Sequence, residues 1–179
     1  MPPPPVGEDF KVQRMMGMDQ LLPRRRLLGW LGASAALPVL AACGSGAEAK
    51  TYPVRFTEAE WRKRLTPKQF HILRRKGTEV PGTSALLGEH RRGTFVCAGD
   101  GNALFASDTK YESGTGWPSF WRPLPGAIAT STDWETGFPR TEVHCAKCGG
   151  HLGHVFADGP KPTGKRYCMN GDAMSFRPA

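Results

Sequence analysis

The sequence lacks the features of a membrane-embedded, repetitive or doubly wound protein. Its longest largely apolar run covers residues 27–42 and contains Pro38, so it is short of the ~20 apolar residues that a membrane-spanning helix needs. No later segment is long enough either, no internal repeat is present, and strand and helix patterns do not alternate as in βαβ units. These absences leave a single globular domain with appended segments as the simplest organisation for 179 residues.

The sequence also lacks a dense tract of Lys or Arg after residue 43. The formal net charge is +8, from 24 basic and 16 acidic residues, and a basic balance can attract nucleic acid or an anionic surface. Because the two signs are interspersed along the chain, we interpret them mainly as a solvated surface. We therefore predict no nucleic-acid binding, and we expect a monomer.

The N-terminal region has the pattern of an export signal. Three arginines (24–26) precede the apolar run, and Cys43 closes it, which fits a signal peptide. The adjacent arginines followed by leucines resemble a twin-arginine signal. The tetrapeptide LAAC that ends at Cys43 resembles a lipobox, which predicts cleavage before Cys43 and lipidation of that residue. The alternative is ordinary cleavage nearby, with Cys43 removed or left free.

This pattern predicts three segments and a location. Residues 1–43 are the export or lipoprotein signal, residues 44–55 are a small, polar and flexible tether, and residues 56–179 are the folded domain. The expected product is an exported bacterial protein in the periplasm, attached to a membrane only through a lipid anchor.

The domain begins with helix signals and continues with strand signals. Thr57 and Glu60 form a capping-box pattern, and Thr66 with Gln69 forms a second one that Gly77 ends. After Gly82, short runs of β-forming residues are separated by Gly, Pro and Asp turns. These runs are GTFVCA, NALFAS, RTEVHCA, GHVFA, KRYCMN and AMSF. The sequence predicts an α+β domain that is mainly β, with antiparallel sheets and short N-terminal helices.

Four residues have the spacing of two metal-binding knuckles. Cys145 and Cys148 form a CxxC motif, and Cys97 precedes Asp100 by three residues. Paired turns of this kind usually hold structural zinc, although such sites favour Cys and His over Asp. A Cys145–Cys148 disulfide, or paired thiols without metal, are the alternatives, and an oxidising compartment favours the disulfide.

Cys168 stands apart from that group, between Arg166 and Asn170. On a strand, residues two apart share a face, so the three side chains are expected on one side. A neighbouring cation favours a thiolate and hence a nucleophile. The alternative is a buried strand cysteine with no chemical role.

Two histidines and a tryptophan are further candidates. His151 and His154 are three residues apart, which places them on opposite faces of a regular strand, but a turn at Gly153 would let them converge. Trp117 lies before a proline in a glycine-bracketed loop. It is either a core residue or the wall of a small apolar pocket.

Four motifs in this order resemble the B-type peptide methionine sulfoxide reductases, which reduce the R epimer of methionine sulfoxide. They are LTPKQFHILRRKGTE, GTGWPSFW, RTEVHCAKCGGHLGHVF and DGPKPTGKRYCMN, and the resemblance covers residues 56–176. It implies a barrel-like body of two antiparallel sheets. It also implies a role in protein repair under oxidative stress, with oxidised methionine residues of proteins as substrates.

The resemblance implies roles for individual residues. Cys168 matches the nucleophile, which passes through a sulfenic acid, and Arg166 and Asn170 match its supporting neighbours. His154 matches the proton donor, with His151 placing it or a water molecule. Trp117 matches the tryptophan that packs on the substrate methyl group, and Asp158 matches a further substrate-binding residue.

The sequence departs from the family at two positions. Thr115 occupies the place of a resolving cysteine in many members, which implies recycling by an external thioredoxin-like thiol or by an unusual internal thiol. Asp100 occupies the place of a zinc-binding cysteine, which puts the metal in doubt. The rival hypotheses are a catalytically silent metal-binding or interaction lipoprotein on the same scaffold, and a thiol-disulfide oxidoreductase that uses Cys145 and Cys148.

Overall fold

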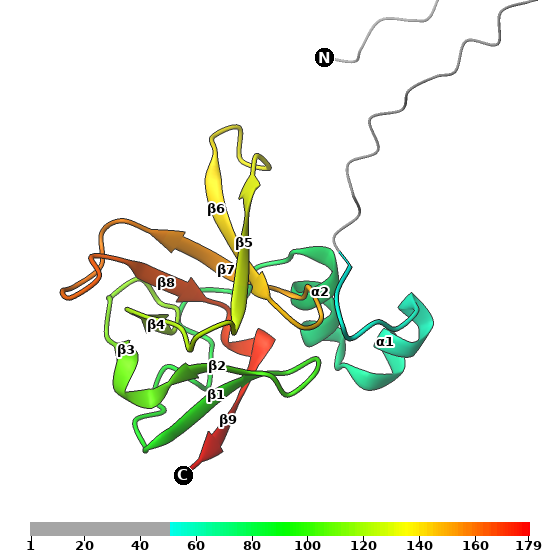
Figure 1. The fold of residues 1–179 in the computed structure, drawn as a ribbon, viewed down its shortest axis with the longest axis horizontal. Helices are drawn as coiled ribbons and strands as arrows, with labels where there is room; N and C mark the ends of the chain where they lie inside the picture. Colours follow the sequence, from blue (N-terminus) through cyan, green and yellow to red (C-terminus); the bar gives the residue numbers. More distant parts are fainter. Residues whose placement is uncertain (1–50) are drawn as a thin grey trace, which may run out of the picture. The chain divides into compact units, whose positions relative to one another are not determined.

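The computed structural model describes residues 51–179, which form two short helices followed by β structure (Figure 1). Helix α1 (Glu58–Arg64) and helix α2 (Pro67–Arg75) each begin at the predicted capping box, with the Thr57 and Thr66 hydroxyls accepting from backbone N–H groups. Helix α2 ends at Arg75, and its C-cap residue Lys76 has a positive φ of 55°. The left-handed residue at this end is thus Lys76, and not Gly77.

The strands follow in two groups. They are β1 (Gly93–Cys97), β2 (Ala103–Ala106), β3 (Lys110–Tyr111), β4 (Ser119–Phe120), β5 (Ile128–Asp133), β6 (Arg140–Cys145), β7 (His151–Phe156), β8 (Arg166–Met169) and β9 (Met174–Pro178), with 3-10 turns η1 (Ser107–Thr109) and η2 (Gly171–Ala173). All strand pairs in this part of the chain are antiparallel. The α+β, mainly β class is therefore confirmed.

The strands form two open sheets rather than a closed barrel. One has the order β2-β1-β9 and the other β3-β4-β8-β7-β6-β5. In the larger sheet the outer strands β3 and β5 do not pair with each other, because each has only one hydrogen-bonded neighbour among the described strands. The two antiparallel sheets that the resemblance implied are present, and the larger one does not close on itself within the described strands. Strand β9 turns away from β8 through η2 and joins β1 in the smaller sheet (Figure 1).

The larger sheet has a core face and a polar face. Along β8, Tyr167 and Met169 are buried, whereas Arg166 and Cys168 are half-buried. The core face continues with Phe120 and with other fully buried apolar residues of the cluster. Alternation along a strand therefore places Cys168 on the opposite face from the hydrophobic core.

One row of polar side chains crosses the polar face. Residues that pair directly across antiparallel strands project to the same side of a sheet. The strand register links, in turn, Tyr111, Ser119, Cys168, His154, Glu142 and Ser131. The fold thus brings a cysteine, a histidine and a carboxylate together from strands that are far apart in the sequence.

A register shift in β7 brings His151 and His154 together. Glu142 pairs with His154 and Val143 with Gly153, but His144 pairs with His151, so Leu152 is passed over. The two imidazole rings consequently lie 5.4 Å apart, centroid to centroid. Convergence arises within a single irregular strand, and not from a turn. Gly153 has φ of 155°, and a Cβ there would collide with the carbonyl oxygen of Cys168.

We expect Gly153→Ala to destabilise the domain by about 2 kcal/mol or more, because the new methyl group meets backbone that cannot move aside cheaply. Thermal unfolding of the full chain measures this loss. The matched control is Gly126→Ala, which shares a positive φ of 66° but has open space at its Cβ position. Equal losses in the two variants would mean that backbone conformation, and not the contact with Cys168, requires the glycine.

The N-terminal part of the described chain packs onto the sheets. Helix α2 buries Phe70, Ile72 and Leu73, and residues 51–55 of the predicted tether touch the domain through a hydrogen bond from Val54 N–H to the Lys147 carbonyl, at 2.9 Å. None of the helices within residues 51–179 has the length and apolar character to cross a membrane. The predicted signal segment, with Cys43, lies outside the described residues.

Candidate active site

A pocket of about 340 Å³ opens on the polar face of the larger sheet. It is lined by residues from β6, β7 and β8, from the β3–β4 loop and from the segment after α2: Thr78, Thr115, Trp117, Arg140, Gly153, His154, Phe156, Arg166, Cys168 and Asn170. Its size falls within the range of small-molecule sites. A nucleophile, an imidazole, an indole and two guanidinium groups therefore share one cavity.

Cys168 is the accessible thiol of the described domain. It is half-buried on β8 between β4 and β7, whereas the other three cysteines of residues 51–179 are buried, and all four are free thiols. The hydroxyl oxygen of Thr115 lies 3.8 Å from its Sγ. Arg166 and Asn170 line the same pocket, in the arrangement that strand alternation predicts.

His154 is held by an ion-pair network from the β5–β6 hairpin. Its Nε2 lies 2.7 Å from Oδ2 of Asp133, and the same oxygen accepts from the Arg140 guanidinium at 2.6 Å. Asp133 and Arg140 face each other across the hairpin. The carboxylate thus links two residues that both line the pocket.

The electrostatics of this network fix the histidine's tautomer. A hydrogen bond from the backbone N–H of Glu135, reinforced by the two side-chain partners, lowers the pKa of Asp133. The carboxylate is therefore ionised and can only accept, so Nε2 of His154 carries a hydrogen. Burial lowers the pKa of His154, and the contact with Asp133 opposes that shift. A second proton, when it binds, sits on Nδ1.

His151 lies behind His154 and does not line the pocket. Its Nδ1 is 2.9 Å from a carboxylate oxygen of Glu142, whose other oxygen accepts from Lys76. Burial acts to raise the pKa of Glu142, but the hydrogen bonds from His151 and Lys76 outweigh it and lower the pKa to about 2. The Nε2 of His151 is buried without a hydrogen-bond partner. This geometry suits a residue that positions His154.

Arg166 is held in the pocket by a carboxylate and an aromatic ring. Its guanidinium donates two hydrogen bonds to the Asp158 carboxylate, at 3.0 and 2.8 Å, and lies 4.4 Å from the centre of the Phe156 ring. Asp158 is exposed and is outside the pocket lining. In this structure it contacts Arg166, so its predicted contact with substrate stays a prediction.

Glu79 connects two other walls of the pocket. Its carbonyl oxygen accepts from Trp117 Nε1 at 3.2 Å, and its N–H donates to the Asn170 side chain at 3.0 Å. Its buried carboxylate accepts from the backbone N–H groups of Gly171 and Asp172. Burial raises the pKa of Glu79. One residue thus sets the positions of an indole and an amide that both line the cavity.

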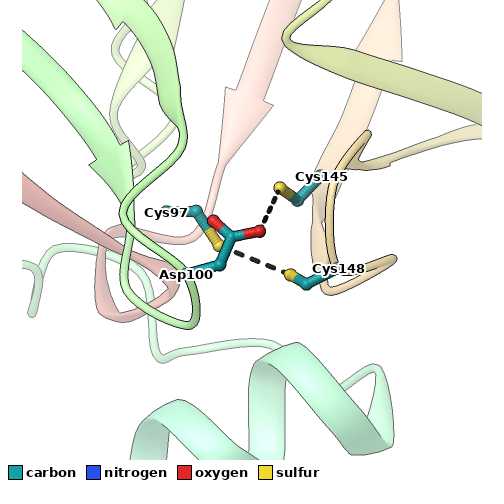
Figure 2. Close-up of side chains that lie close together, drawn as sticks. All are labelled: Cys97, Asp100, Cys145 and Cys148. Carbon is teal, nitrogen blue, oxygen red and sulfur yellow. Dashed lines mark hydrogen bonds between the residues drawn. The ribbon is translucent and has the colours of Figure 1, made fainter. Parts of the chain in front are cut away.

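The four predicted metal ligands form a separate cluster, in which the three cysteines are buried and Asp100 is half-buried (Figure 2). Cys97 ends β1 and Asp100 lies in the turn that follows, while Cys145 ends β6 and Cys148 lies in the turn before β7. One ligand atom from each residue lies within 4.8 Å of all the others. Hydrogen-bond contacts to Cys145 and Cys148, together with burial, raise the pKa of the Cys97 thiol. Joint ionisation of the thiols therefore needs a compensating cation.

The cluster has the dimensions of a tetrahedral metal site. With metal–sulfur bonds of about 2.3 Å, two sulfurs on a tetrahedron are about 3.8 Å apart, and the Cys97 and Cys148 sulfurs lie 3.8 Å apart. The Cys145 sulfur is 3.3 Å from Oδ2 of Asp100, close to the slightly shorter edge that a metal-bound oxygen gives. Three thiols and a carboxylate in this arrangement can hold a metal ion.

The sequence did not reveal the site residues whose contacts depend on the order of the strands in the sheet. Five residues that line the pocket or contact a residue near it were not predicted from the sequence. They are Thr78, Glu79, Asp133, Arg140 and Glu142. Asp133 could have been paired with Arg140 from the hairpin pattern around Gly137. Its contact with His154 depends on strand order, for which the sequence carries no local signal.

Comparison with known proteins gives a consistent result. Residues 65–178 match the SelR domain model. A relative from Leptospira interrogans named peptide methionine sulfoxide reductase MsrB is 54% identical over 127 residues, which cover 70% of this chain and 97% of the relative. A relative of the same name from Agrobacterium fabrum is 52% identical over 126 residues, covering 70% and 93%. The matched region includes the whole pocket and the cysteine cluster.

Proposed function

The chain belongs to the MsrB family of peptide methionine sulfoxide reductases, and from that premise we propose that it reduces the R epimer of methionine sulfoxide in proteins and peptides with Cys168 as the nucleophile. The observation that carries the assignment of Cys168 is its place as the half-buried thiol beside His154 and Trp117 in one pocket. The silent-scaffold alternative is not favoured, because every residue that this chemistry needs lines or adjoins that pocket.

The proposed reaction transfers one oxygen atom. The Cys168 thiolate attacks the sulfoxide sulfur, the oxygen takes up a proton, and methionine leaves while Cys168 becomes a sulfenic acid. The balance is one thiolate, one sulfoxide and one proton giving one sulfenic acid and one thioether. The product methionine regains a flexible apolar side chain, which is the repair.

His154 is the proposed acid. Its Nε2–H donates a hydrogen bond to Asp133, so the proton that can be transferred is the one on Nδ1. Because burial lowers its pKa, the imidazolium is a stronger acid than an ordinary histidine and gives up that proton more readily. His151 and Asp133 act as positioning residues in this scheme.

Trp117 is the proposed wall for the ε-methyl group of the substrate. Its indole N–H is tied to Glu79, which fixes the orientation of the ring, and Phe156 lies in the same pocket. The apolar surface of the indole and the polar groups Arg166, Asn170 and His154 in the same pocket distinguish the methyl from the oxygen of a pyramidal sulfoxide. Only one epimer can then present its sulfur to Cys168 with both groups well placed.

The proposed recycling uses an external thiol of the thioredoxin-like class. The residue next to the Cys168 sulfur is Thr115, which cannot form a disulfide. The remaining cysteines of residues 51–179 are buried in the metal-binding cluster. The sulfenic acid therefore reacts with an incoming thiol to give a mixed disulfide and water, and a second thiol restores Cys168.

The experiment that tests this function uses the full chain with dithiothreitol and separated R and S epimers of a methionine-sulfoxide peptide. We expect turnover of the R epimer alone. Turnover of S, or of both, would contradict the account of the pocket around Trp117. No turnover of either by folded protein would contradict the assignment of the reaction itself and would return the silent scaffold as the better hypothesis.

We further propose that the ion held by the cysteine cluster is structural zinc. Thiolates bind zinc strongly, and a site with four protein ligands leaves no position open for substrate. The cluster ties the β1–β2 turn to the β6–β7 turn, so a bound ion stabilises the contact between the smaller and larger sheets. It takes no part in the proposed reaction.

We expect Asp100→Cys to hold zinc at least ~10-fold more tightly than the natural chain, because a thiolate replaces the weaker oxygen ligand. Competition with a chelator, read by metal analysis, measures the difference, and the melting temperature should rise with it. The control is Asp108→Cys, which places the new thiol on η1 away from the cluster. Unchanged zinc retention in Asp100→Cys would contradict the proposed zinc site.

We also propose that the chain is exported and anchored by a lipid on Cys43. This proposal rests on the signal and lipobox patterns of residues 1–43. A tethered repair enzyme in the periplasm would meet oxidised methionine residues of other exported proteins. It would act there as a monomer and without nucleic acid.

A further inference from the structure

A chain of hydroxyl groups leads from Cys168 to the backbone beneath Trp117. Thr115 Oγ1 lies 3.8 Å from the Cys168 sulfur and 2.9 Å from Ser113 Oγ. Ser113 Oγ in turn lies 2.7 Å from Ser119 Oγ, and Ser119 is 3.3 Å from the Trp117 carbonyl oxygen. We propose that this chain reverses its hydrogen-bond direction when Cys168 ionises, so that Thr115 becomes the donor that stabilises the thiolate.

Counting hydrogens fixes the direction of the chain for the neutral thiol. Each hydroxyl has one hydrogen to donate. Ser119 donates to the Trp117 carbonyl, so the contact between the serines must be donated by Ser113. The contact between Ser113 and Thr115 must then be donated by Thr115. Thr115 has no hydrogen left, and Cys168 donates its S–H to Thr115.

The thiolate imposes the opposite direction. Once Cys168 has lost its proton, its sulfur can only accept. Thr115 turns its hydrogen toward the sulfur, Ser113 donates to Thr115, and Ser119 donates to Ser113. The hydrogen bond given up is the one to the Trp117 carbonyl, at 3.3 Å the longest of the O···O contacts in the chain. A neutral bond at the far end is exchanged for a charge-assisted one at the sulfur.

The fold holds this chain in place. Ser119 is fully buried and pairs directly with Cys168 between β4 and β8. Ser113 and Thr115 come from the loop that precedes β4, in which Gly114 and Gly116 have positive φ of 73° and 90°. Ser113 and Thr115 are half-buried, and each has its next partner in the chain within hydrogen-bonding distance. Their hydrogens are therefore redistributed along the chain when the sulfur loses its proton. Thr115 touches the reacting sulfur and is thus a catalytic residue, while Ser113 and Ser119 are positioning residues.

The inference deepens the proposed function, because it explains how the nucleophile of that reaction is stabilised. It also gives a function to Thr115, which occupies the position of a resolving cysteine in other members of the family. The hydroxyl that stabilises the thiolate in this chain cannot at the same time be a resolving thiol.

The test measures thiolate formation rather than turnover. The full chain is alkylated with iodoacetamide across a pH series, and the modified Cys168 peptide is quantified by mass spectrometry. Loss of a hydrogen bond to the charged sulfur should raise the midpoint of the pH profile by about one pH unit in Thr115→Val. Below that midpoint, alkylation of the variant should be about tenfold slower than that of the natural chain. Thr115→Ser, which keeps the hydroxyl, should stay within about twofold of the natural chain.

A double-mutant cycle separates the hydroxyl chain from a local packing effect. Ser113→Ala should slow alkylation by roughly threefold in the natural background, because Thr115 loses its donor, and should have no effect in the Thr115→Val background. An unshifted profile in Thr115→Val, an equal loss in Thr115→Ser, or additive effects of the two substitutions would each overturn the proposal. Since alkylation needs no substrate, these outcomes are independent of whether the chain turns over methionine sulfoxide.

Discussion

Replacing Cys168 by serine is expected to lower turnover of the R sulfoxide by a factor on the order of 10⁴ or more, because a serine hydroxyl is a far weaker nucleophile than a thiolate. The pocket supplies no second thiol, as the other described cysteines are buried in the cluster around Asp100. The Thr115 hydroxyl, 3.8 Å away, is likewise unable to form a sulfenic acid. Initial rates with dithiothreitol in excess measure the loss.

The controls for this variant separate chemistry from folding. Serine is close to cysteine in volume, and position 168 is half-buried on a regular strand, so the melting temperature should stay within about 2 °C of the natural chain. Cys43→Ser, which also removes one thiol, should retain full activity. Appreciable turnover by Cys168→Ser would show that another residue is the nucleophile.

Replacing His154 by glutamine is expected to lower the rate of the oxygen-transfer step by about 10²- to 10³-fold, the range for loss of a general acid. Glutamine preserves a donor toward Asp133, so the hairpin network of Asp133 and Arg140 should survive. Single-turnover experiments without reductant isolate this step. His90→Gln removes an exposed histidine and should leave the rate unchanged.

The pH dependence of that step identifies the acid. Because burial lowers the pKa of His154 below its ordinary value, the imidazolium is lost as the pH rises through a value under about 6.5. The natural chain should therefore show a limb on which the rate limited by proton transfer falls with increasing pH. That limb should disappear in His154→Gln. A limb that persists in the variant would assign the proton to a different group.

Local sequence patterns predicted most of the secondary structure. The capping boxes at Thr57 and Thr66 require only neighbouring residues, and both helices begin there. The turn between β1 and β2 and the strands that carry the cysteine and histidine motifs follow from short-range alternation and glycine turns. Strands β3, β4 and β5 were missed, because two of them contain only two residues and the last four residues of β5 are polar.

Only those parts of the site that depend on short sequence motifs were predicted. Arg166, Cys168 and Asn170 share a pocket because strand alternation is a local rule. The convergence of His151 and His154 requires a register shift at Leu152 between β6 and β7. Such an irregularity depends on how neighbouring strands pair, which spacing along one strand does not reveal. Their predicted chemical roles stay predictions until the variants are measured.

Long-range order explains the remaining differences. The contact of Asp133 with His154 exists because β5, β6 and β7 lie side by side, and the sequence of β5 alone contains no sign of it. Whether the larger sheet closes on itself depends on long-range order in the same way. Closure depends on pairing between edge strands, and in residues 51–179 the two-residue strand β3 and the strand β5 remain at opposite edges.

The central claim is that Cys168 takes the sulfoxide oxygen and becomes a sulfenic acid, and that no other cysteine of residues 51–179 forms a disulfide with it. The most direct test mixes the full chain with excess R-methionine-sulfoxide peptide in the absence of reductant, counts the methionine formed, and traps sulfenic acid with dimedone before peptide mapping. The account predicts about one methionine per chain, with the label on Cys168. A label on Cys97, Cys145 or Cys148, or a new disulfide between cysteines of residues 51–179, would contradict it.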